Sequence, residues 1–390
     1  MDFTIQDDLA AHREQAREWF EANFEQAWAD DQYHTGSHQT MELHKRMAEQ
    51  GLLGAGWPKE YGGSDVDPDF VRAVYREYVN ADIRMDAWMT TVMVLHTILA
   101  LGTEEQKQYF VGGAMRGEIL IALGYSEPES GSDVAAAKTK ATRDGDEWVI
   151  DGQKMFTSTA EKCSHVIVLA RTDPDLPKHK GLTMFLVPTD VPGFEVQPIH
   201  TLGNQRTNTT YYSGVRIPDT LRLAGVNEGW SVIRTALVYE RGVGMPYKPI
   251  RVGEHLAEWA QSTTRPDGTR PFDDQQVAER LGRMATESEV ARLLASRLDW
   301  MVARDMVPSV EGSMSKMFRS ETDQRHYRDA LDVLGAEGLL APGAPGAPRH
   351  GTFEFGFRAA VVETIYGGAS EIMREMIAEG RLKLPRNRGK

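Results

Sequence analysis

The sequence of 390 residues has a single cysteine, Cys163, so no disulfide can form within the chain. This usage is typical of proteins from a reducing compartment. The amino-terminal segment is acidic and amphipathic, and it lacks both the basic start and the apolar run of a signal peptide. We therefore expect a cytoplasmic protein in which Cys163 is a small buried residue rather than a nucleophile.

The sequence also lacks a hydrophobic run long enough to cross a bilayer. Its longest apolar stretch, residues 87–101, is shorter than the roughly twenty residues that a membrane helix needs, and it predicts a buried helix. Positive charge is in deficit as well, because the net charge is −13. Such a surface repels nucleic-acid phosphates, so we expect neither a membrane span nor a nucleic-acid partner.

Metal-site and hydrolase motifs are missing too. His34 and His38 are four residues apart, with His44 following, but no carboxylate signature accompanies them and Gly36 interrupts the helical pattern. A pair of histidines in a surface loop, His34 and His38, is therefore favoured, and no metal site is expected. The sequence has no Gly-x-Ser-x-Gly elbow, and Gly242-Val-Gly244 lacks the third glycine of a dinucleotide fingerprint.

Hydrophobic periodicity divides the chain into three parts. Residues 1–118 are predicted to be helical, residues 119–222 show the period of two that predicts a small β domain, and residues 228–385 return to helical spacing. The clearest apolar stripes are Trp19, Phe20, Asn23, Phe24 and Ala27; Phe70, Val71, Val74, Tyr75, Tyr78 and Val79; and Val277, Leu281, Met284, Ser288, Ala291, Ala295, Leu298 and Val302. The proline-rich segment 341–348 predicts a loop.

The most informative segment is Gly124–Asp133, which reads GYSEPESGSD. Pro128 biases Glu127 toward an extended conformation, and Gly131 lets the backbone approach a ligand closely. The Ser132 hydroxyl and neighbouring N–H groups can then donate to a phosphate, so the loop suits a pyrophosphate.

A second segment, Trp148–Ser158, follows fifteen residues after Asp133 and ends in Phe156-Thr157-Ser158. We expect Phe156 and Ser158 to lie on the same side of a β-strand, where one side chain can stack on a flat ligand and the other can donate a hydrogen bond. The alternative is an ordinary β-turn followed by a core phenylalanine.

Together these two segments resemble the signatures of the acyl-CoA dehydrogenase family, and the order helices, β domain, helices matches that family over nearly the whole chain. The resemblance implies an α+β fold with an N-terminal helical domain, a middle β-barrel-like domain and a C-terminal four-helix bundle, and it implies bound FAD. The implied flavin contacts are Tyr125, Ser126, Gly131, Ser132, Phe156 and Ser158. Two further elements resemble contacts to FAD, namely Arg270 with Phe272, and the turn containing Gly335 and Gly338, for which a helix C-cap is the alternative.

Dehydrogenation between Cα and Cβ of an acyl thioester needs a base for the α-proton. Many family members carry it as a glutamate near the C-terminus, where this sequence has Tyr366-Gly367-Gly368. A subset, which includes the isovaleryl and long-chain enzymes, supplies it from an earlier helix within a Leu-Glu-Arg motif, and Glu240-Arg241 matches that place. Glu240 follows Trp230, Ile233 and Leu237 at helical spacing, so we expect it on an apolar stripe where desolvation raises its pKa. The alternative is a structural ion pair.

The resemblance further implies an acyl-CoA substrate, with Arg241, Tyr366 and Gly367 at its pocket, and an acceptor of the electron-transfer-flavoprotein type. It also implies a homo-oligomer, or a hetero-oligomer with a related chain as in some actinobacterial members that act on steroid side-chain or branched CoA esters. Two alternatives stay open: a flavin oxidase or monooxygenase on the same scaffold, and a catalytically weak partner subunit. Basic residues that could receive CoA, or could be solvated loop charges, are Arg171, Lys178, Lys180 and Arg206.

Overall fold

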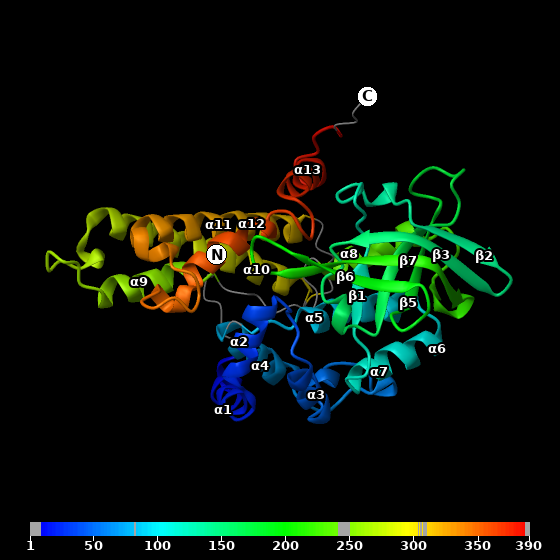
Figure 1. Cartoon of the computed structure of the whole chain (residues 1–390), viewed down its shortest axis with the longest axis horizontal. Helices are drawn as coiled ribbons and strands as arrows, with labels where there is room; N and C mark the ends of the chain where they lie inside the picture. Colours follow the sequence, from blue (N-terminus) through cyan, green and yellow to red (C-terminus); the bar gives the residue numbers. More distant parts are fainter. Residues whose placement is uncertain are drawn as a thin grey trace. The chain divides into compact units, whose positions relative to one another are not determined.

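The computed structural model describes residues 9–81, 83–240, 250–302, 304, 306 and 310–386, without the side chains of residues 238–240, 299 and 302. The chain folds into two compact units (Figure 1). One contains the described residues of Met1–Thr201 and Gln205–Glu240, and the other contains Leu202–Asn204 and the described residues of Tyr247–Lys390. The N-terminal helices and the β domain therefore form a single unit.

The N-terminal helices have clear sequence signals at their starts. In α4 the Asp67 side chain caps the helix by accepting from the N–H of Asp69, and Pro68 occupies the first turn. Thr103 and Gln106 form a capping box at the start of α6. The helices are α1 (Arg13–Asn23), α2 (Gln26–Thr35), α3 (Met41–Glu49), α4 (Pro68–Asn80), α5 (Asp86–Leu101), α6 (Glu104–Gln106), a π-helical turn (Lys107–Val111) and α7 (Gly112–Met115).

The apolar stretch 87–101 lies in α5, and most of its side chains are buried, so the prediction of a buried helix is confirmed. None of the helices in the described part of the chain has the length and hydropathy of a membrane span. The prediction of one stripe over residues 19–27 is wrong in one respect, because α1 ends at Asn23 and α2 begins at Gln26. The Asn23 side chain donates to the Trp19 carbonyl, and Phe24 is extended, which ends the first helix.

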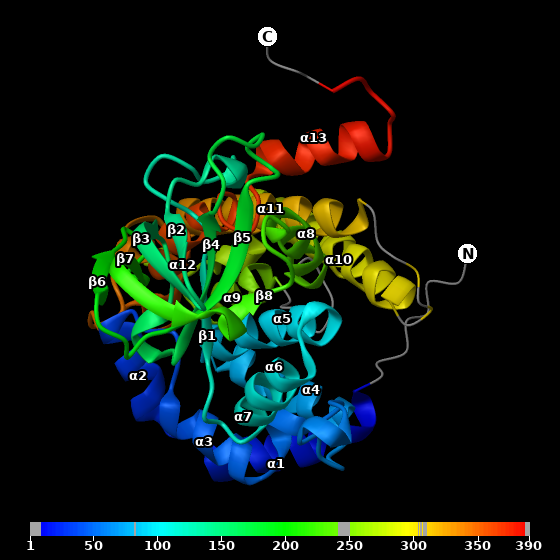
Figure 2. The same cartoon turned by 90° about the vertical axis from the view of Figure 1, so that its right-hand side faces the viewer.

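Eight strands form one sheet, in the order β6-β7-β3-β2-β4-β5-β8, with β1 parallel to β4 (Figure 2). The central strands β4 and β5 are buried over almost their whole length. The strands are β1 (Ile121–Gly124), β2 (Lys140–Asp144), β3 (Glu147–Met155), β4 (His165–Arg171), β5 (Leu182–Pro188), β6 (Phe194–His200), β7 (Arg206–Pro218) and β8 (Arg222–Leu223).

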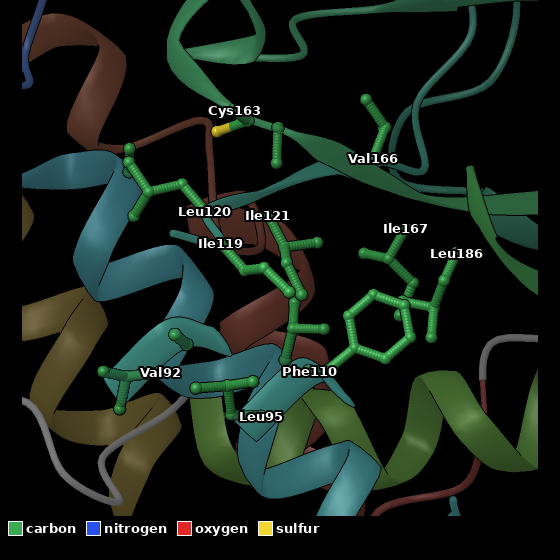
Figure 3. Close-up of a cluster of buried hydrophobic side chains, with 14 of the residues drawn as sticks. Val92, Leu95, Phe110, Ile119, Leu120, Ile121, Cys163, Val166, Ile167 and Leu186 are labelled. Atoms are coloured by element: carbon green, nitrogen blue, oxygen red, sulfur yellow. The ribbon is translucent and has the colours of Figure 1, made fainter. Parts of the chain in front are cut away.

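The core of the first unit joins the N-terminal helices to the sheet (Figure 3). The Phe110 ring, from the π-helical turn, lies beside Ile167 of β4 and Leu186 of β5. Cys163 is buried, as predicted, and burial raises the pKa of its thiol to about 12, so it is not a poised nucleophile. This shared core fixes the loops of the sheet relative to α2, α3 and α5.

The second unit is helical. Its main cluster of buried hydrophobic residues comes mostly from α9, α10, α11 and α12, and the stripe predicted for residues 277–302 lies along α10, with Met284, Ala291 and Leu298 buried. The proline-rich segment 341–348 lies outside the helices α11 and α12, as predicted. The helices are α9 (Val252–Ser262), α10 (Gln275–Val302), α11 (Glu311–Leu334), α12 (Thr352–Glu363) and α13 (Ser370–Gly380).

Acid stability is expected to depend on His44 of α3, which is fully buried 5.4 Å from the Trp88 ring, with no hydrogen-bond partner for either ring nitrogen among the described residues. Burial lowers the pKa of His44 to about 4, so below pH 6.5 the unfolded chain binds a proton that the native protein does not. Stability is therefore lost as the pH falls from about 6.5 to 4. We expect His44→Leu to reduce the loss of unfolding free energy between pH 7.5 and 5 by about 2 kcal/mol.

The measurement is urea unfolding, followed by tryptophan fluorescence at both pH values. His34→Leu, at an exposed position, is the control and should leave the pH dependence as in the wild type. An unchanged acid slope in His44→Leu would show that this ring does not couple protonation to unfolding.

Candidate functional site

The segment Gly124–Asp133 leaves β1 and makes a tight turn. The N–H of Glu127 donates to the Ser130 carbonyl at 2.9 Å, and the N–H of Ser130 donates back to the Glu127 carbonyl at 3.1 Å. Pro128 and Glu129 form the tip, which agrees with the extended Glu127 expected before a proline. The Ser126 carbonyl accepts from the N–H of Met155 at 2.9 Å, which ties the loop to the end of β3.

A buried ion pair fixes this loop from beneath. The Lys154 ammonium, which is fully buried, lies 2.7 Å from Glu127 Oε1, and the same carboxylate accepts from the N–H groups of Lys138 and Thr139 at 2.7 and 2.9 Å. Burial lowers the pKa of Lys154 to about 8, although the Glu127 charge opposes that shift. Burial alone would raise the pKa of Glu127, but Lys154 and the two N–H donors lower it.

The far end of the loop is held by Arg171 of β4. Its guanidinium donates to the carbonyls of Ala135 and Lys178 at 2.6 and 2.8 Å, with a longer bond to Ala137. These contacts make Arg171 a structural cross-link rather than an open basic entrance for CoA. Lys178 forms an exposed ion pair with Asp133 at 2.7 Å.

Between these anchors the loop presents three small residues. Gly131 and Ser132 are exposed, and their N–H groups donate to no acceptor within the described residues. The Ser130 hydroxyl is buried without a hydrogen-bond partner in the same part of the chain. A Cβ at Gly131 would meet no atom within 4 Å, so chain packing does not demand glycine there. These donors and this open backbone fit a phosphate group.

The prediction that Phe156 and Ser158 share one side of a strand is wrong. β3 ends at Met155, and Phe156 has a φ of 61°, in the left-handed region that a bulky residue rarely adopts. Thr159 has the same φ. Residues 156–161 instead form a turn, called here the Phe156 turn. Each of its two left-handed backbone conformations costs about 1–3 kcal/mol of folding free energy, and such conformations persist only where surrounding contacts hold them in place.

The Phe156 turn nonetheless displays both predicted side chains. The Phe156 ring is 59% exposed. By contrast Trp148, the aromatic residue within β3, is buried. Ser158 shares a hydrogen bond of 2.9 Å with the Thr207 hydroxyl of β7. An exposed aromatic ring held in a strained conformation beside a hydroxyl is a feature of functional sites, and it fits the flat, polar-edged ring of a flavin.

Helix α8 (Gly229–Glu240) belongs to the same unit. Ile233 is buried, and Trp230 and Leu237 pack partly buried against the core, so the apolar stripe is confirmed as far as Leu237. Glu240 is the last residue of α8, three residues after Leu237 on the same phase. The Glu240 side chain and the whole of Arg241 lie outside the described residues.

The predicted FAD contacts of the second unit lie in turns next to its helices. Arg270 donates two hydrogen bonds of 2.9 Å to Asp273, and Phe272 is 37% exposed. Gly335, with a φ of 61°, follows the end of α11, so it acts as the C-cap that was the alternative for this turn, while Gly338 is buried. Their assignment to FAD stays a prediction.

Tyr366 and Gly367 follow α12. Tyr366 is 48% exposed, and Gly367 has a φ of 62°. Any residue with a side chain would be strained in this left-handed backbone conformation, which explains the glycine at position 367. The missing side chain also leaves space beside the turn. The Gly368 carbonyl accepts from Lys316 at 2.6 Å, which fixes the turn to α11.

Several site residues had no motif that pointed to them: Glu127 and Lys154 as a pair, and Glu161 and Asn208 around the Phe156 turn. A signal existed for Lys154, because it lies on the buried side of β3, where a lysine needs a partner. The sequence could not name that partner, because Glu127 lies 27 residues earlier, in the loop after β1, and only the folded chain brings the two together.

The geometry defines a class of protein: an α+β fold in which N-terminal helices, one β-sheet and C-terminal helices follow in order. Domain families match the three parts in the same order. The acyl-CoA dehydrogenase N-terminal domain matches residues 6–118, the middle domain residues 122–215 and the C-terminal domain residues 227–382.

Individual relatives agree. The chain is 35% identical over 361 residues to acyl-CoA dehydrogenase FadE26 of Mycobacterium tuberculosis, covering 88% of each chain, and 32% identical to acyl-CoA dehydrogenase IpdE1 of the same organism, covering 97% of this chain and 98% of the relative. Among solved structures, the Tcur3481-Tcur3483 steroid ACAD matches with a TM-score of 0.86 and 34% identity, and the ChsE4-ChsE5 complex from Mycobacterium tuberculosis with 0.88 and 32%. Each covers 99% of this chain and 100% of the other.

The chain belongs to the acyl-CoA dehydrogenase family, whose members are FAD-dependent oxidoreductases. The predicted family and fold class are thereby confirmed.

Proposed function

We propose that this protein catalyses α,β-dehydrogenation of an acyl-CoA thioester, with Glu240 as the base that removes the α-proton. The observation that carries the proposal is the pair of displayed segments in the first unit: the Ser130–Ser132 loop with its unused donors, and the strained, exposed Phe156 beside Ser158.

The loop residues would hold the cofactor. Gly131, Ser132 and the buried Ser130 hydroxyl would donate to its pyrophosphate, while the Phe156 ring would lie against the flavin and Ser158 would donate to the ring edge. Tyr125 and Ser126 would complete the contact. When bound, FAD supplies the acceptor for the hydride that leaves the Cβ of the substrate.

The base would come from the end of α8. Glu240 follows Ile233 and Leu237 on a helix that packs on α5. A carboxylate at this helix end, beside the apolar stripe, would be partly desolvated, which would favour proton abstraction from carbon. The turn at Gly367 carries no carboxylate and adopts a left-handed backbone, so it leaves the role of base to another residue.

For the substrate, we propose a CoA ester of a steroid side chain or of another branched acid. Support comes from the steroid ACAD among the compared structures, to which the chain is 34% identical. The names of two compared structures, Tcur3481-Tcur3483 and the ChsE4-ChsE5 complex, each join two components. We therefore also propose that the chain assembles with itself or with a related chain. The electrons would pass to an acceptor of the electron-transfer-flavoprotein type.

The test is anaerobic titration of the purified yellow protein with a panel of acyl-CoA esters that includes straight-chain, branched and cholesterol-derived members. Loss of flavin absorbance with one class and formation of the 2-enoyl product are expected. A protein that binds FAD but is bleached by none of the esters would refute the substrate assignment.

Two other outcomes separate the alternatives. A chain that is colourless alone, and yellow only when co-expressed with a related chain, would identify a partner subunit. Rapid reoxidation of the reduced flavin by air in stopped-flow measurements would identify an oxidase rather than a dehydrogenase.

A further inference from the structure

Glu161, at the end of the Phe156 turn, connects two parts of the first unit. Its Oε1 accepts from the Ser37 hydroxyl at 3.1 Å, and its Oε2 accepts from the Asn208 side chain at 2.7 Å. Ser37 lies in the loop between α2 and α3, and Asn208 lies on β7. The Glu161 side chain is only 14% exposed, so these bonds are shielded from solvent.

Asn208 also forms two hydrogen bonds to the Phe156 turn. The Asn208 side-chain nitrogen Nδ2 donates to the Thr157 carbonyl at 3.0 Å, and the Asn208 backbone carbonyl accepts from the Thr157 N–H at 2.9 Å. Both Asn208 and Thr157 are fully buried. Thr157 lies between Phe156 and Ser158, so the two bonds from Asn208 hold the backbone from which those two side chains project.

The amide orientation has one further determinant. Arg206 Nε donates to Asn208 Oδ1 at 3.3 Å and lies 4.0 Å from Glu161 Oε1. The Asn208 amide nitrogen therefore donates to Glu161 and to the Thr157 carbonyl, while its oxygen accepts from Arg206. If the amide were rotated by 180°, its oxygen would face two acceptors and these bonds would be lost. Two of these partners also reach the α2–α3 loop: Glu161 through its side chain, and Arg206 through its backbone N–H.

The α2–α3 loop is itself rigid enough to serve as an anchor. The Gly36 carbonyl accepts from the N–H of Arg206 at 2.9 Å. His38 lies 3.0 Å from Asp86 at the start of α5, and the N–H of Asp86 donates to the His38 carbonyl at 2.8 Å. The loop is thus tied to both the sheet and α5 before it contacts Glu161.

We propose that Glu161 is a positioning residue, which holds the Phe156 turn in its strained conformation for flavin binding by linking it through Asn208 to the α2–α3 loop. The inference rests on the proposed function, because it assigns the turn to FAD. Without the Glu161 carboxylate, the Asn208 amide loses one acceptor and the turn loses its connection to Ser37. Phe156 is then free to leave the left-handed region, which a bulky residue disfavours.

The test compares FAD binding by Glu161→Ala, Glu161→Gln and Ser37→Ala with that of the wild type, after the apoprotein is titrated with FAD. We expect Glu161→Ala to weaken FAD binding about tenfold or more, as for the loss of a charge-assisted hydrogen bond. Glu161→Gln should retain most of the affinity, because its amide can accept from Asn208 while the Ser37 hydroxyl accepts from it. Ser37→Ala should fall between the two.

The second measurement is the visible circular dichroism and the fluorescence of the bound flavin, which report on the environment of the ring. A merely structural role for Glu161 would lower thermal stability without changing these spectra at saturating FAD. The control is Glu195→Ala, at an exposed carboxylate on β6, which should leave both affinity and spectra unchanged.

Wild-type affinity and wild-type flavin spectra in Glu161→Ala would overturn the inference while leaving the proposed function intact. If Glu161→Ala does not fold, Ser37→Ala decides: unchanged affinity and spectra there would equally overturn it. A wild-type protein that binds no FAD would instead refute the proposed function, so the two failures are distinguishable.

Discussion

Replacing Glu240 with glutamine is expected to slow the anaerobic bleaching of the flavin by an acyl-CoA ester by about 10²–10⁴-fold, the range that a positioned general base contributes. Glutamine keeps the size of the side chain at the end of α8, but its amide cannot take a proton from carbon. The measurement is stopped-flow absorbance after mixing the FAD-loaded protein with the best ester of the panel. The affinity for FAD should stay as in the wild type.

Two variants sharpen this result. Glu240→Asp keeps the carboxylate but shortens it by one methylene, so it should retain a rate between the wild type and Glu240→Gln. Glu228→Gln changes an exposed carboxylate just before α8, which accepts from the N–H of Gly225, and it should react as the wild type does. Wild-type bleaching by Glu240→Gln would show that another residue is the base.

Much of this site could be predicted from local sequence, because its signals are local. The turn Glu127-Pro128-Glu129-Ser130, the exposed Gly131 and the helical phase that leads to Glu240 depend on residues within a few positions of one another. Proline, glycine and helical periodicity act on the backbone directly, so the sequence alone carries the information.

The remaining features depend on contacts between distant residues. Phe156 continues the period of β3, but it leaves the strand in a turn that is held by bonds from β7, among them those from Asn208 about fifty residues later. The partner of Lys154, Glu127, lies 27 residues earlier in the loop after β1, so their pairing depends on how that loop folds onto β3. Similarly, Arg171 is a plausible CoA contact by charge, but its bonds to loop carbonyls depend on the folded loop. Side-chain charge alone does not tell a structural cation from a ligand-binding one.

The largest effect on stability is expected from Lys154→Met. The substitution leaves the Glu127 carboxylate buried with two N–H donors but no cation, and breaking a buried pair in this way costs about 3–5 kcal/mol. Because Glu127 holds the loop that contains Ser130, FAD binding should weaken as well. Urea unfolding of the apoprotein at pH 7.5 and an FAD titration measure the two effects.

A matched control and a double variant separate the buried charge from loss of packing. Lys138→Met removes a cation that pairs with Glu129 at the surface of the same loop, and it should cost under about 1 kcal/mol, as for exposed ion pairs. Glu127→Gln combined with Lys154→Met removes the unpaired charge, so the double variant should be more stable than Lys154→Met alone. If the double variant is the less stable of the two, the cost in Lys154→Met comes from lost packing of the lysine stem around β3, and the ion pair does not hold the cofactor loop.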